Sequence, residues 1–139
     1  MIIDFHTHAF PDKLAPGALA HLTENARAYA HLYGEAHPHT DATLDGLTAS
    51  ARRAGIDFSL VLPIATSPKP SRTINDFAAQ ADKHPGLRSF GSVHPGNPDW
   101  EEELERAAAL GLRGIKLHPE YQGFFADDEK MRPIYRRIS

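Results

Sequence analysis

The segment that decides the fold is Ile2–His8, which reads IIDFHTH and alternates between apolar and polar side chains. In an extended strand, residues two apart lie on the same face, so Asp4, His6 and His8 are predicted to point one way. Three polar groups on the inner face of a strand are costly to bury without a partner. A divalent cation supplies that partner, because imidazole nitrogens bind it directly and a carboxylate can orient a ring. The segment therefore predicts a first strand with a metal site at its carboxyl end.

Strand-like and helix-like segments alternate along the rest of the chain. Ile3 and Phe5, the apolar residues of the first strand, are predicted to face the helices. The predicted order is a helix over Asp12–Leu32 interrupted at Pro16-Gly17, a loop over Gly34–Thr40, a helix over Thr43–Ala54, a strand over Phe58–Ile64, a helix from Ser71 to about Lys83, a strand over Leu87–Val93, a helix capped by Asn97 with Pro98 in first position and ended by Gly111, a strand over Leu112–His118, a loop over Pro119–Phe125 and a last helix from near Pro133.

This alternation predicts an α/β fold in which parallel strands are joined by right-handed crossovers. The 139 residues hold about four β/α units, whereas a closed (β/α)8 barrel of the TIM type takes roughly 250 residues. We therefore expect a single domain, residues 1–139, that forms a half-barrel. A half-barrel exposes strand edges and an apolar inner face, so the chain is expected to be partial or to pair with a second copy as a homo-oligomer.

Composition narrows the function. Hydrophobic residues make up 41% and charged residues 24% of the chain, as in ordinary globular domains. The net charge of −3 and the pI near 6.3 exclude the basic surface of a nucleic-acid binder, and no apolar run approaches the roughly 18 residues of a membrane span. The start lacks a signal-peptide pattern and the chain has no cysteine, so we expect a cytoplasmic protein whose metal is held by nitrogen or oxygen ligands.

The strand predicted over Leu112–His118 repeats the logic of the first. Gly114, Lys116 and His118 share one face, while Ile115 and Leu117 are predicted to face outward. A buried lysine is rare unless it is paired or functional. Lys116 is therefore a candidate cation for an anionic substrate or a carboxylated bridging ligand; the alternative is an ammonium that reaches solvent or an ion pair. His118 is expected to line the site.

Other side chains near the strand ends are candidates for the wall of a substrate pocket. These are Asp4, His94 at the end of a strand, and Tyr121 and Phe124 in the loop that follows His118; for the aromatic residues, simple packing is the alternative. The remaining histidines of the nine are expected in a solvated loop (His37, His39) or on helix surfaces (His21, His31, His84).

Three segments together resemble a known family. They are Ile3–His8 (IDFHTH), Phe90–Pro95 (FGSVHP) and Leu110–Pro119 (LGLRGIKLHP). The chain resembles, over nearly its whole length, the amidohydrolase-2 branch of the amidohydrolase superfamily, which includes decarboxylases similar to aminocarboxymuconate-semialdehyde decarboxylase and many metal-dependent hydrolases. The combination is far more specific than His-x-His alone.

The resemblance implies a (β/α)8 barrel with one divalent metal ion, usually zinc or manganese. It implies that His6 and His8 are ligands and that the remaining ligands, two histidines and an aspartate on later strands, lie beyond Ser139. Lys116 matches the position that holds a carboxylated lysine or a glutamate in other branches of the superfamily. Two imidazoles alone would hold a divalent ion weakly, since a catalytic zinc needs three protein ligands and an open position.

Three functions are therefore weighed. The first is an enzyme that uses its metal to activate water or polarise a small carboxylate- or carbonyl-bearing substrate, which gives hydrolysis or decarboxylation. The second is a metal-dependent phosphoesterase or deoxyribonuclease, against which the charge of −3 and the Lys116/His118 strand count. The third is a non-enzymatic remnant or interaction module. We favour the first for the intact protein.

Overall fold

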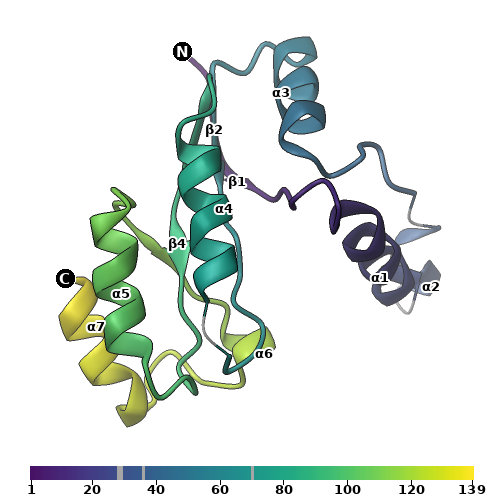
Figure 1. Cartoon of the computed structure of the whole chain (residues 1–139). Helices are drawn as coiled ribbons and strands as arrows, with labels where there is room; N and C mark the ends of the chain where they lie inside the picture. Colours follow the sequence, from purple (N-terminus) through teal and green to yellow (C-terminus); the bar gives the residue numbers. More distant parts are fainter. Residues whose placement is uncertain (28–29, 36, 70) are drawn as a thin grey trace.

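The computed structural model describes residues 1–27, 30–35, 37–69 and 71–139. Its elements in chain order are β1 (Ile3–Thr7), α1 (Ala15–Arg27), α2 (Ala30–Tyr33), α3 (Leu44–Arg53), β2 (Phe58–Val61), α4 (Arg72–Asp82), β3 (Leu87–Ser89), β4 (Gly91–Ser92), α5 (Trp100–Ala109), β5 (Ile115–Lys116), α6 (Pro119–Gln122), the 3-10 helix η1 (Glu129–Met131) and α7 (Arg132–Ile138) (Figure 1). Parts of the predicted Asp12–Leu32 helix and Gly34–Thr40 loop, residues 28, 29 and 36, lie outside the described residues.

The strands form two parallel sheets, ordered β1-β2-β3 and β4-β5. Every strand pairing among the described residues is parallel, which confirms the predicted α/β class with parallel strands. Helix α4 lies over the strands, and α5 and α7 lie beside each other next to it (Figure 1). No helix in the described part of the chain is long and apolar enough to cross a bilayer.

The strand predicted over Leu87–Val93 is broken at Phe90. The N–H of Phe90 donates to the carbonyl of Val61 on β2 at 3.2 Å, while the next N–H, of Gly91, donates to Gly114 beside β5 at 2.8 Å. The chain thus changes partner at this residue, from β2 on one side to β5 on the other. A side chain at position 114 would collide with the Phe90 ring, so Gly114 lets the ring lie against the backbone.

The predicted orientation of Ile3 and Phe5 is wrong. Ile3 pairs with Phe58, but the register shifts between Asp4 and Thr7, where β1 advances three residues while β2 advances two. Ile3 and Phe5 are 39% and 67% exposed, and they line an open hollow of about 350 Å³ instead of packing in the core beneath the helices. The prediction assumes that side chains alternate strictly between the two faces of β1, and the register shift interrupts this alternation. Thr7, which is 7% exposed, is the residue of β1 whose side chain is buried.

The core lies between the sheets and the helices. Val61 and Leu87 from the first sheet pack with Phe77 and Ala81 of α4 and with Leu44 of α3. A second cluster joins Val93 to Leu104 of α5 and to Met131 and Ile134 near the carboxyl end. Ile115 and Leu117 pack against the helical side, which confirms their predicted outward orientation.

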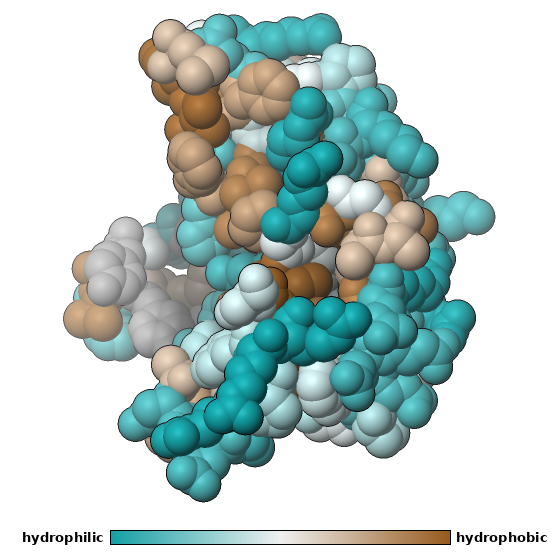
Figure 2. Space-filling view, turned by 90° about the vertical axis from the view of Figure 1, so that its left-hand side faces the viewer, coloured by the Kyte–Doolittle hydropathy of each residue, from teal (hydrophilic) through white to brown (hydrophobic). Residues whose placement is uncertain are grey.

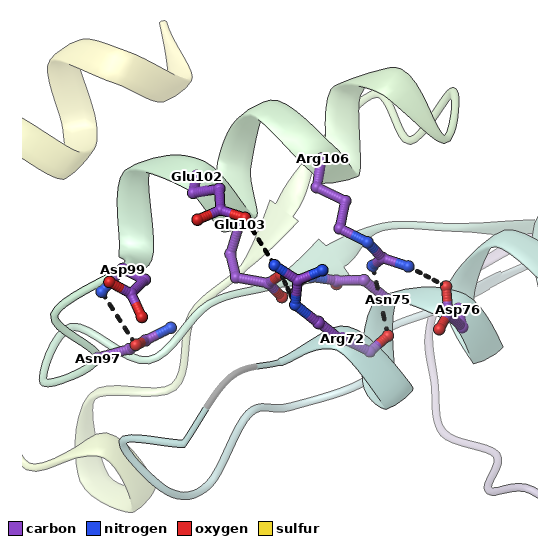
Figure 3. A network of polar contacts seen from close by, with 8 residues as sticks. All are labelled: Arg72, Asn75, Asp76, Asn97, Asp99, Glu102, Glu103 and Arg106. Carbon is purple, nitrogen blue, oxygen red and sulfur yellow. Dashed lines mark hydrogen bonds and ion pairs between the residues drawn. The ribbon is translucent and has the colours of Figure 1, made fainter.

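A network of polar contacts links α4 to α5 beside this core (Figure 3). Arg72 pairs with Glu102 at 2.6 Å, and the guanidinium of Arg106 pairs with Asp76. Asn75, fully buried, lies 3.4 Å from the carboxylate of Glu103, which is 2% exposed. Because each partner comes from a different helix, the network fixes how α4 and α5 lie against each other.

Three helices differ from the prediction in where they begin or in whether they are interrupted. Pro16 and Gly17 lie in the first turn of α1 and do not interrupt it, because the first turn needs no proline N–H. Helix α5 begins at Trp100, two residues late, since Oδ1 of Asn97 accepts the N–H of Asp99 in a turn before the helix. The predicted loop after His118 contains the short helix α6.

Hydrophobic surface is left exposed near the N-terminus. Met1, Ile2 and Phe5 are 95%, 58% and 67% exposed. Figure 2 shows hydrophobic side chains gathered toward the top of the molecule, the end at which Figure 1 places the N-terminus. Met1 and Ile2 precede β1, so they lie at the opposite end of this strand from His8.

Candidate metal centre and substrate cavity

Two imidazole rings lie side by side at the carboxyl end of β1. The ring centroids of His6 and His8 are 5.1 Å apart, and the ring planes make an angle of 62°. Nδ1 of His8 lies 2.9 Å from the carbonyl oxygen of Leu62, just after β2. A carbonyl oxygen only accepts hydrogen bonds, so Nδ1 carries the proton and Nε2 keeps its lone pair. Metal-binding histidines are commonly oriented in this way, by an acceptor on the other ring nitrogen.

The surroundings of His8 favour its neutral form. Packing around the ring lowers the pKa of His8 below its ordinary value of 6.5, although part of the residue is open to solvent. The hydrogen bond to Leu62 raises the pKa, and the positive charges of His6, Lys116 and His118 lower it again. A metal ion binds the neutral form of an imidazole, and the lowered pKa of His8 favours that form.

Lys116 and His118 reach the same region from β5. Lys116 is the last residue of β5, and both side chains are close enough to His8 for their charges to act on its pKa. Nδ1 of His118 accepts the N–H of Tyr121 at 3.4 Å, and the two rings stack with centroids 4.2 Å apart and planes 9° from parallel. His6 lies beside His8, and His8 and His118 line one cavity, so these three predicted site residues are brought together. The charge of Lys116 lowers the pKa of His8.

Three other predicted residues make contacts of a different kind. Oδ1 of Asp4 accepts the backbone N–H of His6 at 3.1 Å, whereas the sequence pattern predicts that this carboxylate orients an imidazole. Nδ1 of His94 accepts the N–H of Gly96 at 3.0 Å, and burial and the charge of Lys130 lower the pKa of His94. Phe124, 6% exposed, packs in the core and does not wall a pocket, because the turn after α6 carries it inward.

A cavity of about 690 Å³ opens beside His8 and His118. One wall comes from α1 and the segment before it, another from the start of α4 and the segment after β2, and Tyr121 completes the polar side. Most of the lining side chains are apolar: Ala9, Phe10, Pro11, Leu14, Ala18, Leu22, Pro63, Ile64, Ile74 and Phe77. A largely apolar hollow with a few convergent polar groups has the composition of a small-molecule site.

His21 also lines this cavity, and sequence reasoning missed it by placing it on a helix surface. The signal was present in the helical spacing. Leu14, Ala18, His21 and Leu22 lie three or four residues apart, which puts them on one face of a helix. That face carries two leucines, so His21 belongs with an apolar stripe directed at other parts of the protein.

Comparison with protein families identifies the family of the chain. The family described as Amidohydrolase matches residues 3–139. The chain belongs to the amidohydrolase family. Membership indicates an enzyme of the metal-dependent hydrolase type, and no curated protein matches the chain significantly.

The donor set of this amidohydrolase fits a metal ion in part. Divalent zinc and manganese accept imidazole nitrogen, and the Nε2 atom of His8 has a free lone pair for such a bond. Within the described ranges, no group of three or more His, Cys, Asp or Glu side chains is arranged to hold a metal. The described part of the amidohydrolase therefore has two neighbouring imidazoles, those of His6 and His8, and no third such side chain grouped with them.

Proposed function

We propose that this amidohydrolase is a metal-dependent hydrolase or carbon–carbon lyase, which holds one divalent cation through Nε2 of His6 and Nε2 of His8. Zinc is favoured over manganese because imidazole ligands suit zinc. The observation that carries the proposal is the pair of rings 5.1 Å apart, one of them tied through Nδ1 to the carbonyl of Leu62. We further propose a (β/α)8-type scaffold, since the polar residues gather beyond the carboxyl ends of parallel strands.

The chain's own residues have separate tasks in this proposal. When bound, the cation supplies Lewis-acid polarisation of a substrate oxygen or a water of lowered pKa. The ammonium of Lys116 would pair with a negatively charged group of the substrate. Apolar side chains of α1 and α4, such as Leu14 and Ile74, would enclose the rest of a small carbonyl- or carboxylate-bearing molecule and exclude water.

The same cavity bears on the phosphoesterase alternative. A phosphoesterase would be expected to line its site with additional acidic ligands. The described residues that line the cavity include no Asp or Glu, and most of them are apolar. The lining therefore favours a substrate with an uncharged body and disfavours a nucleotide or a sugar phosphate.

The proposal is tested by zinc binding to the protein and to two matched double variants. In His6→Ala/His8→Ala the proposed ligands are removed. In His37→Ala/His39→Ala, a second His-x-His pair is removed from an exposed loop. We expect isothermal titration to show zinc binding weakened about 10–100-fold or more in the first variant and unchanged in the second. Equal binding by the parent protein and the first variant would sink the proposal.

A further inference from the structure

One buried amide ties together the ends of three strands beside the candidate site. Nε2 of Gln122, on α6, donates to the carbonyl of Ala65 at 2.8 Å and to the carbonyl of Val93 at 2.9 Å. Its Oε1 accepts the backbone N–H of His118 at 2.8 Å. Ala65 follows β2, Val93 follows β4 and His118 follows β5, so the three bonds fix the backbone of His118 against both sheets.

The burial of Gln122 shows how firmly this arrangement is held. The residue is 5% exposed, and both N–H groups and the carbonyl oxygen of its amide are used. Ser92, fully buried, reinforces it: its Oγ donates to the carbonyl of Lys116 and accepts the N–H of Ala65, both at 2.9 Å. These side chains link the first sheet to the second at the end where the polar residues gather.

The ring of His118 is fixed in a second way. The backbone N–H of Tyr121 donates to Nδ1 of His118, and the Tyr121 ring stacks on the imidazole. A nitrogen that accepts a hydrogen bond has no proton, so in neutral His118 the proton is on Nε2. His8 has the opposite arrangement, with its proton on Nδ1 and a lone pair on Nε2. Of the two histidines that line this cavity, His118 therefore has an N–H donor at Nε2, and His8 has a lone pair at Nε2.

We propose that His118 donates a hydrogen bond from Nε2 to an oxygen of the substrate and does not bind the metal, and that Gln122 is the positioning residue that holds it there. The proposal rests on the proposed function for the metal at His6 and His8. A fixed N–H donor aimed at an oxygen that gains negative charge stabilises that charge without reorganisation, as a backbone donor does in an oxyanion hole. The substrate class is therefore one with a carbonyl or carboxylate oxygen beside an uncharged body.

Long-range ¹H–¹⁵N correlation spectra of the histidine-labelled protein at about pH 8 test this directly, since neutral imidazoles are populated there. A His118→Asn variant assigns the His118 signals. We expect His118 to show protonated Nε2 and unprotonated Nδ1, and to keep this pattern when Zn²⁺ is added, while the signals of His6 and His8 shift. If the His118 signals take the metal-bound pattern, or show protonated Nδ1 at the start, the inference is overturned and the metal proposal stands.

If the signals of no histidine change when Zn²⁺ is added, the proposed function is overturned instead.

The role of Gln122 is tested with Gln122→Met, which keeps the length of the side chain, and with Gln80→Met on the exposed face of α4 as the control. We expect the single-tautomer pattern of His118 to be lost in the first variant and kept in the second. An unchanged pattern in a folded Gln122→Met would refute the positioning role. If that variant does not fold, the same measurement on Gln122→Asn, whose shorter amide cannot span all three bonds, takes its place.

Discussion

A methyl group added at Gly114 should destabilise the fold by a predictable mechanism. In Gly114→Ala, the new Cβ would lie 2.6 Å from the nearest ring atom of Phe90, closer than real Cβ contacts. The ring must shift into the hollow that it lines, and overpacking of this kind costs about 1–3 kcal/mol of unfolding free energy. At roughly 4 °C per kcal/mol for a chain of this size, Tm should fall by about 4–12 °C.

Urea unfolding followed by circular dichroism measures this cost. Gly17→Ala in α1 is the matched control, because no atom lies within 4 Å of the position that its new methyl group would take, and alanine favours helix by up to about 1 kcal/mol. In a Phe90→Leu background the cost of Gly114→Ala should fall by about 1 kcal/mol or more, since the ring is gone. Equal cost in both backgrounds, or a Gly114→Ala variant as stable as the parent, would refute this reasoning.

Three further predictions concern hydrogen bonds and charge. Ser92→Ala removes the partner of the buried N–H of Ala65 and of the part-buried carbonyl of Lys116, and should lower the unfolding free energy by about 1–3 kcal/mol for the buried group alone. Thr43→Ala removes the oxygen that accepts the N–H of Gly46 at the start of α3 and should cost about 1 kcal/mol. Burial lowers the pKa of His94, so the unfolded chain binds more protons than the folded chain does. The contribution of His94 to the unfolding free energy is therefore complete above the ordinary imidazole pKa and is lost as pH falls toward the folded pKa. His94→Asn should therefore flatten the fall in stability as pH is lowered from about 8 to below the ordinary imidazole pKa.

Each of these has a control on an exposed residue. Ser67→Ala and Thr66→Ala should leave urea midpoints within about 0.5 kcal/mol of the parent, and His39→Asn should leave the pH dependence unchanged. If Ser92→Ala or Thr43→Ala behaved like its control, the assigned hydrogen bond would not be stabilising the fold. An unchanged pH slope in His94→Asn would mean that other groups carry the linkage.

Features that depend on residues close together in the sequence could be predicted from the local pattern of apolar, polar and capping residues. The α3 helix, predicted over Thr43–Ala54, forms over Leu44–Arg53 with Thr43 as its cap. The strand predicted over Leu112–His118 forms only over Ile115–Lys116, but the predicted orientation of Ile115 is confirmed by its packing. The neighbouring rings of His6 and His8 follow from their spacing on β1. In each case the deciding interactions lie within a few residues of one another.

The failures come from contacts between distant segments. The strand break at Phe90 depends on hydrogen-bond partners on or beside β2 and β5, which are distant in sequence. The exposed orientation of the Ile3 and Phe5 side chains depends on a register shift between β1 and β2. Gln122 binds Ala65 across 57 residues of sequence, and a lone glutamine in a loop-like stretch carries no local signal of such a role. Side-chain hydrogen bonds to distant backbone cannot be recognised from periodicity or propensity.

The central claim, that the first strand supplies two ligands to one cation, is tested most directly by zinc-edge anomalous diffraction from crystals of the protein grown with Zn²⁺. We predict a single strong peak about 2.0–2.1 Å from Nε2 of both His6 and His8, with Nδ1 of His8 still bound to the carbonyl of Leu62. A zinc ion bound elsewhere, with the two imidazoles left uncoordinated, would contradict the account.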